Sequence, residues 1–338
     1  MGNEGKWEKR WHPLREEWVV YAAHRNSRPW NGAPPELPSM PITYDPTCYL
    51  CPGNKRSSGI ENPDYRSVFI FDNDHPVVGV DAPPVEAGGP LYRRGRASGI
   101  ARVICYDPRH HVSLSQLEPK AVTAIFQAFR DQTAEMESDP AIHSVLIFEN
   151  KGEVVGVSNP HPHCQLYATD FPLAQVTRQL EVSSRHRTQH GMDLFTAIIE
   201  AEQLDGRRIL FEDDHVIAFI PFFARWAYEV MIFPKSASCR LTGLTPVELE
   251  SLALAFRTVT GKLDRLQDLP WPYVMSVMQA PVDGVDHLDF RVHLWIQPPY
   301  RQPGLVKYLA GPELGAGNFM ADTIPEEKAA ELRELSTD

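Results

Sequence analysis

Two histidines separated by a single proline form the most unusual motif of the sequence, SNPHPHCQ at residues 158–165. Pro160 and Pro162 have no backbone N–H to donate, so we predict that this segment lies at the edge or the end of a strand. Residues two apart in an extended chain point to the same side, so His161 and His163 present their imidazoles together. The segment predicts a site at which two imidazoles act together, and other residues must identify its chemistry.

Two cysteines and a second pair of histidines supply further ligand types for a metal ion. Cys48 and Cys51 form a CxxC motif that is followed by Pro-Gly-Asn, and residues 110–111 are both histidine. A CxxC loop can wrap one zinc ion, and two imidazoles can complete a closed tetrahedral site. A redox dithiol usually begins a helix, so we predict a structural metal rather than a redox dithiol or two buried thiols. One histidine of the pair 110–111 and either His161 or His163 would complete the ligand set.

The histidine that the metal leaves free is suited to nucleophilic chemistry on phosphorus. An uncharged imidazole attacks phosphorus readily, and a covalent intermediate splits one difficult displacement into two easier ones. Ser158 and Gln165 flank the two histidines and offer hydrogen-bond donors to phosphoryl oxygens that gain negative charge. These neighbours favour a catalytic histidine over a satisfied core or surface histidine.

Two other polar pairs are ordinary when each is taken alone. Arg25 and Arg28 are permanent cations in a loop with glycine and proline, and solvated arginines are common. Asn73 and Asp74 end an apolar stretch, where Asn-Asp is usual turn chemistry. Neither pair identifies a site by itself.

Short strands and one long helix are predicted to position these residues. The apolar stretches 68–74, 101–108 and 144–152 are typical of buried strands that end in turns. Residues 118–136 have apolar side chains at helical spacing and a proline suited to the first turn. Residues 25–63 are rich in Pro, Gly and Asn, which predicts an ordered loop with little regular structure.

The second half of the chain repeats this pattern. Residues 103–136 and 230–263 share a strand, a loop with serine, Leu-x-x-Leu, a helix that begins with proline, and Ala-Phe-Arg followed by threonine. FDNDHPVV at 71–78 likewise resembles FEDDHVIAFIP at 211–221. We predict a tandem duplication of an α+β unit with mainly antiparallel strands and one long helix each. The second copy has Arg-Val-His-Leu-Trp at 291–295 instead of His-Pro-His-Cys-Gln, so the chemistry should lie in the first half.

The composition excludes several classes of protein. The 338 residues include 43% hydrophobic and 23% charged residues, as expected of a soluble globular protein. A formal net charge of −11 without a basic cluster disfavours binding to nucleic acid. We find no signal peptide and no apolar run near the roughly 20 residues of a membrane span, so we expect no membrane partner and a cytoplasmic protein. Five cysteines, an odd number, argue against a disulfide framework.

Taken together, the motifs resemble those of the galactose-1-phosphate uridylyltransferases, a two-repeat family of the histidine triad superfamily. The matching segments are HRNSRPWNGA, CYLCPGN, NPDY, FIFDND, ARVICYDPRHH, FENKG, SNPHPHCQ and, more weakly, FPK and VKYLAGPE. The resemblance implies an α+β fold of tandem histidine-triad-like repeats. We expect residues 1–175 to form the first repeat, with the HPH motif and the metal ligands, and residues 176–338 to form a degenerate second repeat with a substrate-contacting tail.

The resemblance also implies a reaction. In that family, the second histidine of HPH attacks the α-phosphorus of UDP-glucose and releases glucose 1-phosphate, and galactose 1-phosphate then collects the uridylyl group as UDP-galactose. Carried over to this sequence, the nucleophile is His163. The residues expected to contact phosphates are Gln165, Ser158, Asn150, Arg25 and Arg28, and those expected near uracil and ribose are Asn73 and Asp74.

A structural Zn²⁺ and a homodimer are implied as well. The zinc ligands of the family fall on Cys48, Cys51, His110 and His161, with His110 favoured over His111 by its distance from VICYDP. A tail that carries Lys307 and Glu313 is expected to reach the hexose in the partner subunit.

Several positions depart from the family pattern. Met278 and Trp295 stand where two histidines of a second metal site are expected, so we predict no second metal. His75 replaces an aromatic residue of the uracil pocket, while Pro312 and Phe319 replace a tyrosine and a glutamine of the tail. The tail is more similar to that of ADP-glucose phosphorylases, which makes such an adenylyltransferase the alternative function. A nucleotide-binding scaffold without turnover is a further alternative, which the intact serine, histidine and glutamine set disfavours.

Overall fold

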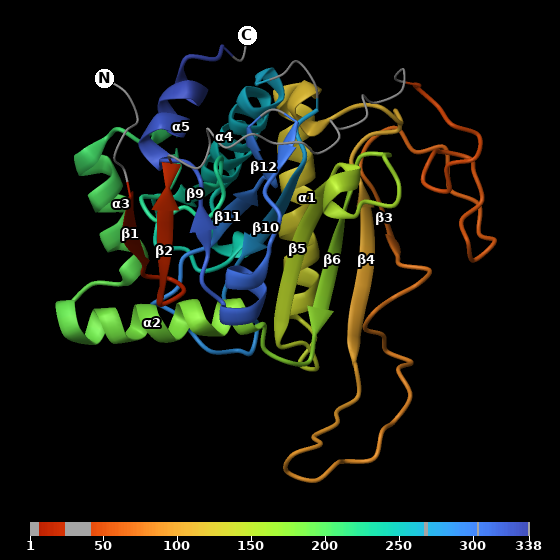
Figure 1. Cartoon of the computed structure of the whole chain (residues 1–338). Coiled ribbons are helices and arrows are strands. Elements are labelled where there is room, and N and C mark those ends of the chain that lie inside the picture. Colours follow the sequence, from red (N-terminus) through yellow and green to blue (C-terminus); the bar gives the residue numbers. More distant parts are fainter. Residues whose placement is uncertain (1–6, 24–41, 267–269, 303, 337–338) are drawn as a thin grey trace.

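A nine-stranded sheet to which both halves of the chain contribute forms the centre of the molecule (Figure 1). The computed structural model describes residues 7–23, 42–266, 270–302 and 304–336. The strand order is β3-β4-β6-β5-β10-β11-β9-β8-β7, and every neighbouring pair is antiparallel. The prediction of mainly antiparallel strands is therefore confirmed.

The two halves repeat one order of elements. In the first half these are β3 (Phe69–Asp72), β4 (Gly99–Cys105), α1 (Pro119–Glu137), β5 (Ser144–Lys151) and β6 (His163–Thr169). In the second half they are β7 (Ile209–Glu212), β8 (Val216–Phe219), β9 (Val230–Pro234), α4 (Pro246–Arg265), β10 (Tyr273–Met278) and β11 (His293–Gln297). Strands β5 and β10 pair at the centre and join the halves, with Phe148 opposite Ser276. The predicted strand and helix positions agree with these bounds to within a few residues.

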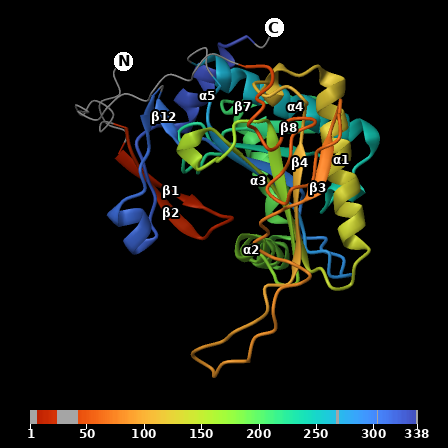
Figure 2. The ribbon, with the colours of Figure 1, turned by 90° about the vertical axis from the view of Figure 1, so that its right-hand side faces the viewer.

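The two halves differ in one region where the sequence predicts equivalent structure, namely residues 71–78 and the similar residues 211–221. A tight turn joins β7 to β8, and β8 pairs with β9. In the first half β3 itself pairs with β4, and the chain between them leaves the sheet as a long projecting loop (Figures 1 and 2). Residues 76–79, the counterpart of β8, form no strand; Pro76 begins this segment and a proline-rich stretch follows it.

Helices α1 and α4 cover the same face of the sheet. They pack against each other, with the rings of Phe126 and Phe256 5.7 Å apart, and share one core with the inward side chains of both halves. Each begins with proline at its first position, and Thr245 and Glu248 form a capping box at the start of α4. The long helix predicted for each repeat is thus observed.

The opposite face of the sheet is covered in the second half alone by two helices that we did not predict. Helices α2 (Ala174–His190) and α3 (Leu194–Asp205) pack on alternate side chains of the second-half strands, such as Phe219 and Phe233. In the first half the side chains of β5 and β6 on this face are only half-buried. This difference leaves room for a site on the first repeat.

A small second sheet brings both ends of the chain together in front of this face. Strand β2 (Glu17–Ala22) pairs antiparallel with β1 (Trp7–His12) and parallel with β14 (Met320–Ala321). A short ribbon, β12 (Tyr300–Gln302) with β13 (Leu305–Val306), precedes β14, and α5 (Pro325–Arg333) follows it. Figure 2 shows β1 and β2 on the side of the large sheet opposite to α1. None of the described helices is long and apolar enough to span a membrane.

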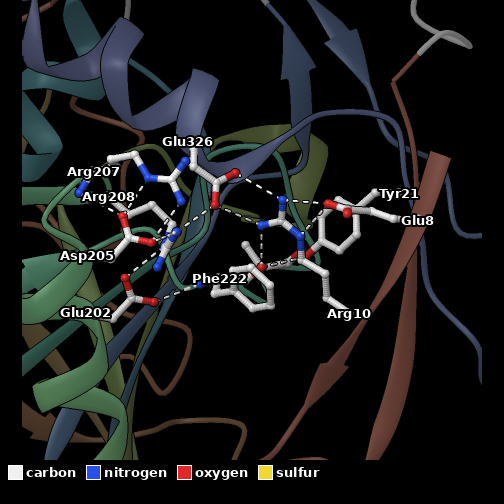
Figure 3. Close-up of polar contacts among 10 residues, drawn as sticks. Glu8, Arg10, Tyr21, Glu202, Asp205, Arg207, Arg208, Phe222 and Glu326 are labelled. Atoms are coloured by element: carbon white, nitrogen blue, oxygen red, sulfur yellow. Dashed lines mark hydrogen bonds and ion pairs between the residues drawn. The ribbon is translucent and has the colours of Figure 1, made fainter. Parts of the chain in front are cut away.

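Glu326 links three of these elements through two arginines (Figure 3). Its carboxylate accepts two hydrogen bonds from Arg10 of β1, at 3.0 and 3.1 Å, and one from Arg208 at 2.6 Å. Arg208 also donates to Glu202 of α3 at 2.8 Å. Burial opposes the charge of Glu326, but the bonds from Arg10 and Arg208 outweigh it and hold the pKa of the carboxyl below its ordinary value. The network fastens α5 to β1 and α3.

Substitution Glu326→Ala is expected to lower the free energy of unfolding by about 3 kcal/mol, because it leaves two buried guanidinium groups without their shared partner. Chemical denaturation of wild type and variant measures this difference. The matched control is Glu334→Ala at an exposed position near the end of α5, which should change stability little. Equal effects of the two substitutions would contradict the role of the network.

Candidate functional site

Two cysteines and two histidines from three loops meet in a buried cluster. The ligand atoms of Cys48, Cys51, His110 and His161 all lie within 4.8 Å of one another. The Sγ atom of Cys51 is 3.5 Å from Nδ1 of His110 and 3.5 Å from Nδ1 of His161. This set of two thiols and two imidazoles has the composition and the closed surroundings of a structural zinc site. The four ligands predicted from the sequence are therefore brought together.

The protonation preferences of these side chains fit a bound cation. Burial raises the pKa of the Cys51 thiol to about 11, so a nearby positive charge is needed to keep it as the thiolate. Burial lowers the pKa of His161 to about 4, which keeps the imidazole neutral and able to bind a metal. A metal ion satisfies both side chains at once.

The loop that carries the cysteines is shaped by asparagine side chains. Asn54 donates to the carbonyl oxygens of Asp45 and Cys48, at 2.9 and 2.8 Å. Asn62 donates to the carbonyl of Cys51 at 3.1 Å. Because these bonds replace regular secondary structure, the loop is ordered without helix or strand, as the sequence predicted for residues 42–63.

Tyr65 supports His161 and was not identified from the sequence as a functional residue. Its hydroxyl lies 2.8 Å from Nε2 of His161 and 2.7 Å from the carbonyl oxygen of Leu50. With Nδ1 directed at Cys51, the Nε2–H of His161 donates to the hydroxyl, which donates to Leu50 in turn. Asn159 has a similar role, since its Oδ1 accepts from the backbone N–H of His161 at 3.0 Å.

His163 begins β6 and faces the half-buried side of the first repeat. Its Nδ1 lies 2.7 Å from the carbonyl oxygen of His161, so Nδ1–H donates there and Nε2 keeps a lone pair. Burial lowers the pKa of His163, which keeps the imidazole uncharged at neutral pH. A neutral, oriented imidazole is competent as a nucleophile.

A hollow surrounds His163. It is lined by side chains and backbone of β5, β6 and the intervening loop, namely Phe148, Asn150, Gly156, Val157, Ser158, His163, Cys164 and Gln165. The loop turns at Gly152, which has a φ of +96° and lies so close to Pro272 that a Cβ would come within 2.7 Å of that side chain. The predicted residues Ser158, Asn150 and Gln165 thus line one space with His163.

Gln165 is oriented by two neighbours. Its Oε1 accepts from the Nδ2 of Asn73 at 3.4 Å and from the hydroxyl of Tyr167 at 3.2 Å. With the oxygen occupied in this way, the Nε2 of Gln165 is left to donate toward an anionic oxygen in the hollow. The role of Tyr167 was missed because its only signal is its place two residues after Gln165 on the same face of the strand.

Other predicted residues lie outside this hollow. Asp74 accepts one hydrogen bond from the hydroxyl of Ser57 and one from the backbone N–H of Ser58, both at 3.2 Å. These bonds hold the loop after the CxxC motif. Lys307 donates to Glu313 at 2.7 Å in the segment before β14. Phe319 is fully buried in the core of the small sheet. Arg25 and Arg28 fall in residues 24–41, outside the part of the chain that the structure describes.

The second repeat has a counterpart of His163 that no substrate can reach. Nδ1 of His293 lies 2.9 Å from the carbonyl oxygen of Arg291, which repeats the bond between His163 and His161. The ring of His293 is fully buried and lies against the rings of Phe195 and Phe233. The same backbone geometry is therefore retained in a closed core.

Comparisons with known proteins give one consistent family. Residues 3–172 match the family model for the galactose-1-phosphate uridyl transferase N-terminal domain, and residues 179–338 match that for the C-terminal domain. Galactose-1-phosphate uridylyltransferase of Haemophilus influenzae is 35% identical over 331 residues, covering 97% of this chain and 94% of that protein. The enzyme of Rattus norvegicus is 34% identical, covering 96% of this chain and 87% of that protein.

Solved structures agree with this result. A uridylyltransferase structure has a TM-score of 0.79 at 32% identity and covers 97% of each chain. An ADP-glucose phosphorylase of Arabidopsis thaliana with bound ADP-glucose has a TM-score of 0.78 at 20% identity, covering 98% of this chain and 99% of that one. At that identity, the second likeness is one of fold.

Substitution Tyr65→Phe is expected to weaken metal binding about tenfold, because it removes the hydroxyl that orients His161. Competition with a chromophoric chelator measures the affinity of the purified protein for Zn²⁺. Tyr49→Phe, at an exposed tyrosine of the same loop, is the control. Unchanged affinity in the Tyr65 variant would show that His161 needs no such support.

Substitution Cys51→Ser should reduce the metal content and the melting temperature together, because the closed site loses a thiolate. Elemental analysis and a thermal melt provide the two readouts. Wild-type metal stoichiometry in this variant would refute the four-ligand assignment.

Proposed function

The chain belongs to the galactose-1-phosphate uridylyltransferase family, and on this basis we propose that it transfers UMP from UDP-glucose to galactose 1-phosphate. In the first step, Nε2 of His163 attacks the α-phosphorus and the bond to the oxygen of glucose 1-phosphate breaks. In the second step, a phosphate oxygen of galactose 1-phosphate attacks the uridylyl-histidine, and the P–N bond breaks. The products are glucose 1-phosphate and UDP-galactose.

The observation that carries this proposal is the orientation of His163. Its Nδ1–H is bound to the carbonyl of His161 at 2.7 Å, so the lone pair on Nε2 is the one available for attack. The carbonyl also stabilises the positive charge that the imidazole gains as the P–N bond forms. A nucleophile held in this way reacts without first losing a proton.

We assign the remaining residues of the hollow to the phosphates. Gln165, whose oxygen is occupied by Asn73 and Tyr167, would donate through Nε2 to an oxygen of the α-phosphate. Ser158 and Asn150 line the same hollow and would donate to neighbouring phosphate oxygens. Asn73, at the end of β3, would lie near the uridine, whereas Asp74 would act through the loop that it anchors.

We propose that the metal is zinc and that its role is structural. Bound by Cys48, Cys51, His110 and His161, it would hold the loops around the hollow, and it would supply no reacting group. The Tyr65 hydroxyl and the Asn159 amide would keep His161 in place, and with it the carbonyl oxygen that accepts the hydrogen bond from Nδ1–H of His163.

We propose that the protein is a cytoplasmic homodimer, and the tail supports the presence of a second copy. Lys307 and Glu313 belong to the layer of β12, β13 and β14, and neither lines the hollow around His163 of the same chain. A second copy could bring its own tail to this hollow, where its lysine would meet the hexose phosphate. On the basis of the family resemblance, we propose Arg25 and Arg28 as further phosphate ligands. We also propose residues 1–175 and 176–338 as the two repeats.

Incubation with UDP-glucose in the absence of acceptor is expected to add one uridylyl group to the wild-type protein and none to His163→Asn. Intact-protein mass spectrometry detects the adduct. Asparagine keeps a hydrogen-bonding side chain but has no nucleophilic nitrogen, so metal content and melting temperature should match those of the wild type.

ADP-glucose serves as the second donor in this experiment. An adenylyl adduct in place of the uridylyl adduct would assign the chain to the ADP-glucose phosphorylase reaction. No adduct with either donor would favour a nucleotide-binding scaffold. His293→Asn is the matched control, because His293 has the same backbone bond in the closed repeat and should leave adduct formation intact.

A further inference from the structure

Four neighbouring strands place polar side chains directly behind the reactive face of the sheet. Glu149 lies on β5 and Cys164 on β6, Tyr273 begins β10, and Tyr106 directly follows β4. All four are buried in the core beneath α1 and α4. This group, which we call the rear cluster, has no role in the transfer steps as described above.

Glu149 is the centre of the rear cluster. The hydroxyl of Tyr273 donates to its Oε2 at 2.9 Å. The Tyr106 hydroxyl interacts electrostatically with the carboxyl of Glu149 and the thiol of Cys164, and it has no hydrogen-bond partner among the described residues. The backbone N–H of Tyr106 donates to the carbonyl of Pro162 at 3.0 Å, inside the HPH motif. The cluster is thus connected to the segment that holds His163.

Among the residues that the structure describes, none forms an ion pair with Glu149. The nearest cation, Lys151, pairs with Asp264 of α4 at 2.9 Å. From α1, the side chains that face this core are mainly apolar, among them Phe126 and Phe129. Burial raises the pKa of Glu149 to about 7, with Lys151 and Tyr273 opposing the rise and Asp264 adding to it. The carboxyl therefore titrates in the physiological range.

The strand that carries Glu149 also forms the wall of the hollow. Its two chain neighbours, Phe148 and Asn150, point to the opposite face and line the space around His163. Phe148 is paired with Gln165 across β5 and β6. A movement of Glu149 in the core would therefore move two residues of the site and the strand that holds Gln165.

We propose that Glu149 is a positioning residue, whose neutral carboxyl joins β5 to β10 behind the site and keeps Phe148, Asn150 and Gln165 aligned with His163. The inference rests on the proposed uridylyl transfer and adds to it a control by pH. When the carboxyl ionises, it carries an unpaired charge inside an apolar core, and the core must admit water or shift to solvate it. Transfer is therefore fastest while Glu149 is protonated.

The test compares wild type with Glu149→Gln, which is neutral at every pH and still accepts from Tyr273. The rate of uridylyl adduct formation from UDP-glucose is followed by quenched-flow and intact mass between about pH 6.5 and 8.5. The wild-type rate should fall about threefold or more across this range, whereas the rate of the variant should not fall with pH. The fold remains comparable because glutamine keeps the shape and the hydrogen bond.

Glu229→Gln is the matched control. Glu229 is also fully buried, accepts from the Nε1 of Trp295 at 2.7 Å, and has a pKa raised by burial, but it lies in the second repeat. Its substitution should leave the pH profile of adduct formation like that of the wild type. A purely structural effect of removing a buried carboxyl would appear in both variants alike.

A second variant changes the titration without removing the carboxyl. The Tyr273 hydroxyl bonds best to the ionised form, so Tyr273→Phe should raise the pKa of Glu149 and move the decline in rate to higher pH. Parallel profiles in wild type and Glu149→Gln, or an unmoved decline in Tyr273→Phe, would overturn the positioning role. Absence of any adduct in the wild type at every pH would instead refute the proposed function.

Thermal stability gives a readout that does not depend on activity. The pKa of Glu149 is about 7 in the folded chain against an ordinary value of 4.5, so the folded state binds the extra proton between these values. Stability of the wild type should therefore fall, relative to Glu149→Gln, as the pH rises through this window, and the difference should level off above it. A difference in melting temperature that does not vary with pH would contradict a neutral buried carboxyl.

Discussion

One hydrogen bond, from Nδ1 of His163 to the carbonyl oxygen of His161, connects the imidazole of His163 to the cluster of two cysteines and two histidines. The side chain of His161 faces the cluster, while its backbone selects the tautomer of His163. Because the same residue does both, the loops that carry the candidate metal ligands also determine which nitrogen of His163 keeps its lone pair. Tyr65 and Asn159 constrain His161 from two further directions, so the orientation of the nucleophile depends on a network that begins well outside the hollow.

The second repeat shows that this hydrogen bond does not suffice to make a site. His293 has the same bond to the carbonyl of Arg291, yet aromatic rings enclose it. The difference lies in what covers the sheet: α2 and α3 pack on this face of the second repeat, and β5 and β6 of the first repeat remain half-buried. Duplication supplied two equivalent backbones, and the packing of two added helices separated their roles.

Buried carboxylates hold the molecule together in two different ways. Glu326 is ionised between Arg10 and Arg208 and joins the C-terminal helix to the first strand and to α3 (Figure 3). Glu149 accepts a hydrogen bond from Tyr273 and forms no ion pair with any described residue, so burial favours its neutral form. The carboxylate of Glu326 therefore keeps its charge near neutral pH, whereas the carboxyl of Glu149, with a pKa of about 7, changes its charge there.

The sequence alone indicated the ligand types, the candidate nucleophile and the duplication, because each depends on residue identity and local spacing. The HPH motif, the CxxC loop and the periodicity of α1 and α4 are local patterns of this kind, and the structure agrees with all three. Only the tertiary structure decided which neighbours serve the site. Asn73 turns toward Gln165 while the adjacent Asp74 binds the loop at Ser57 and Ser58, and Phe319 enters a core. These outcomes depend on contacts between segments far apart in the chain, which adjacent residues do not encode.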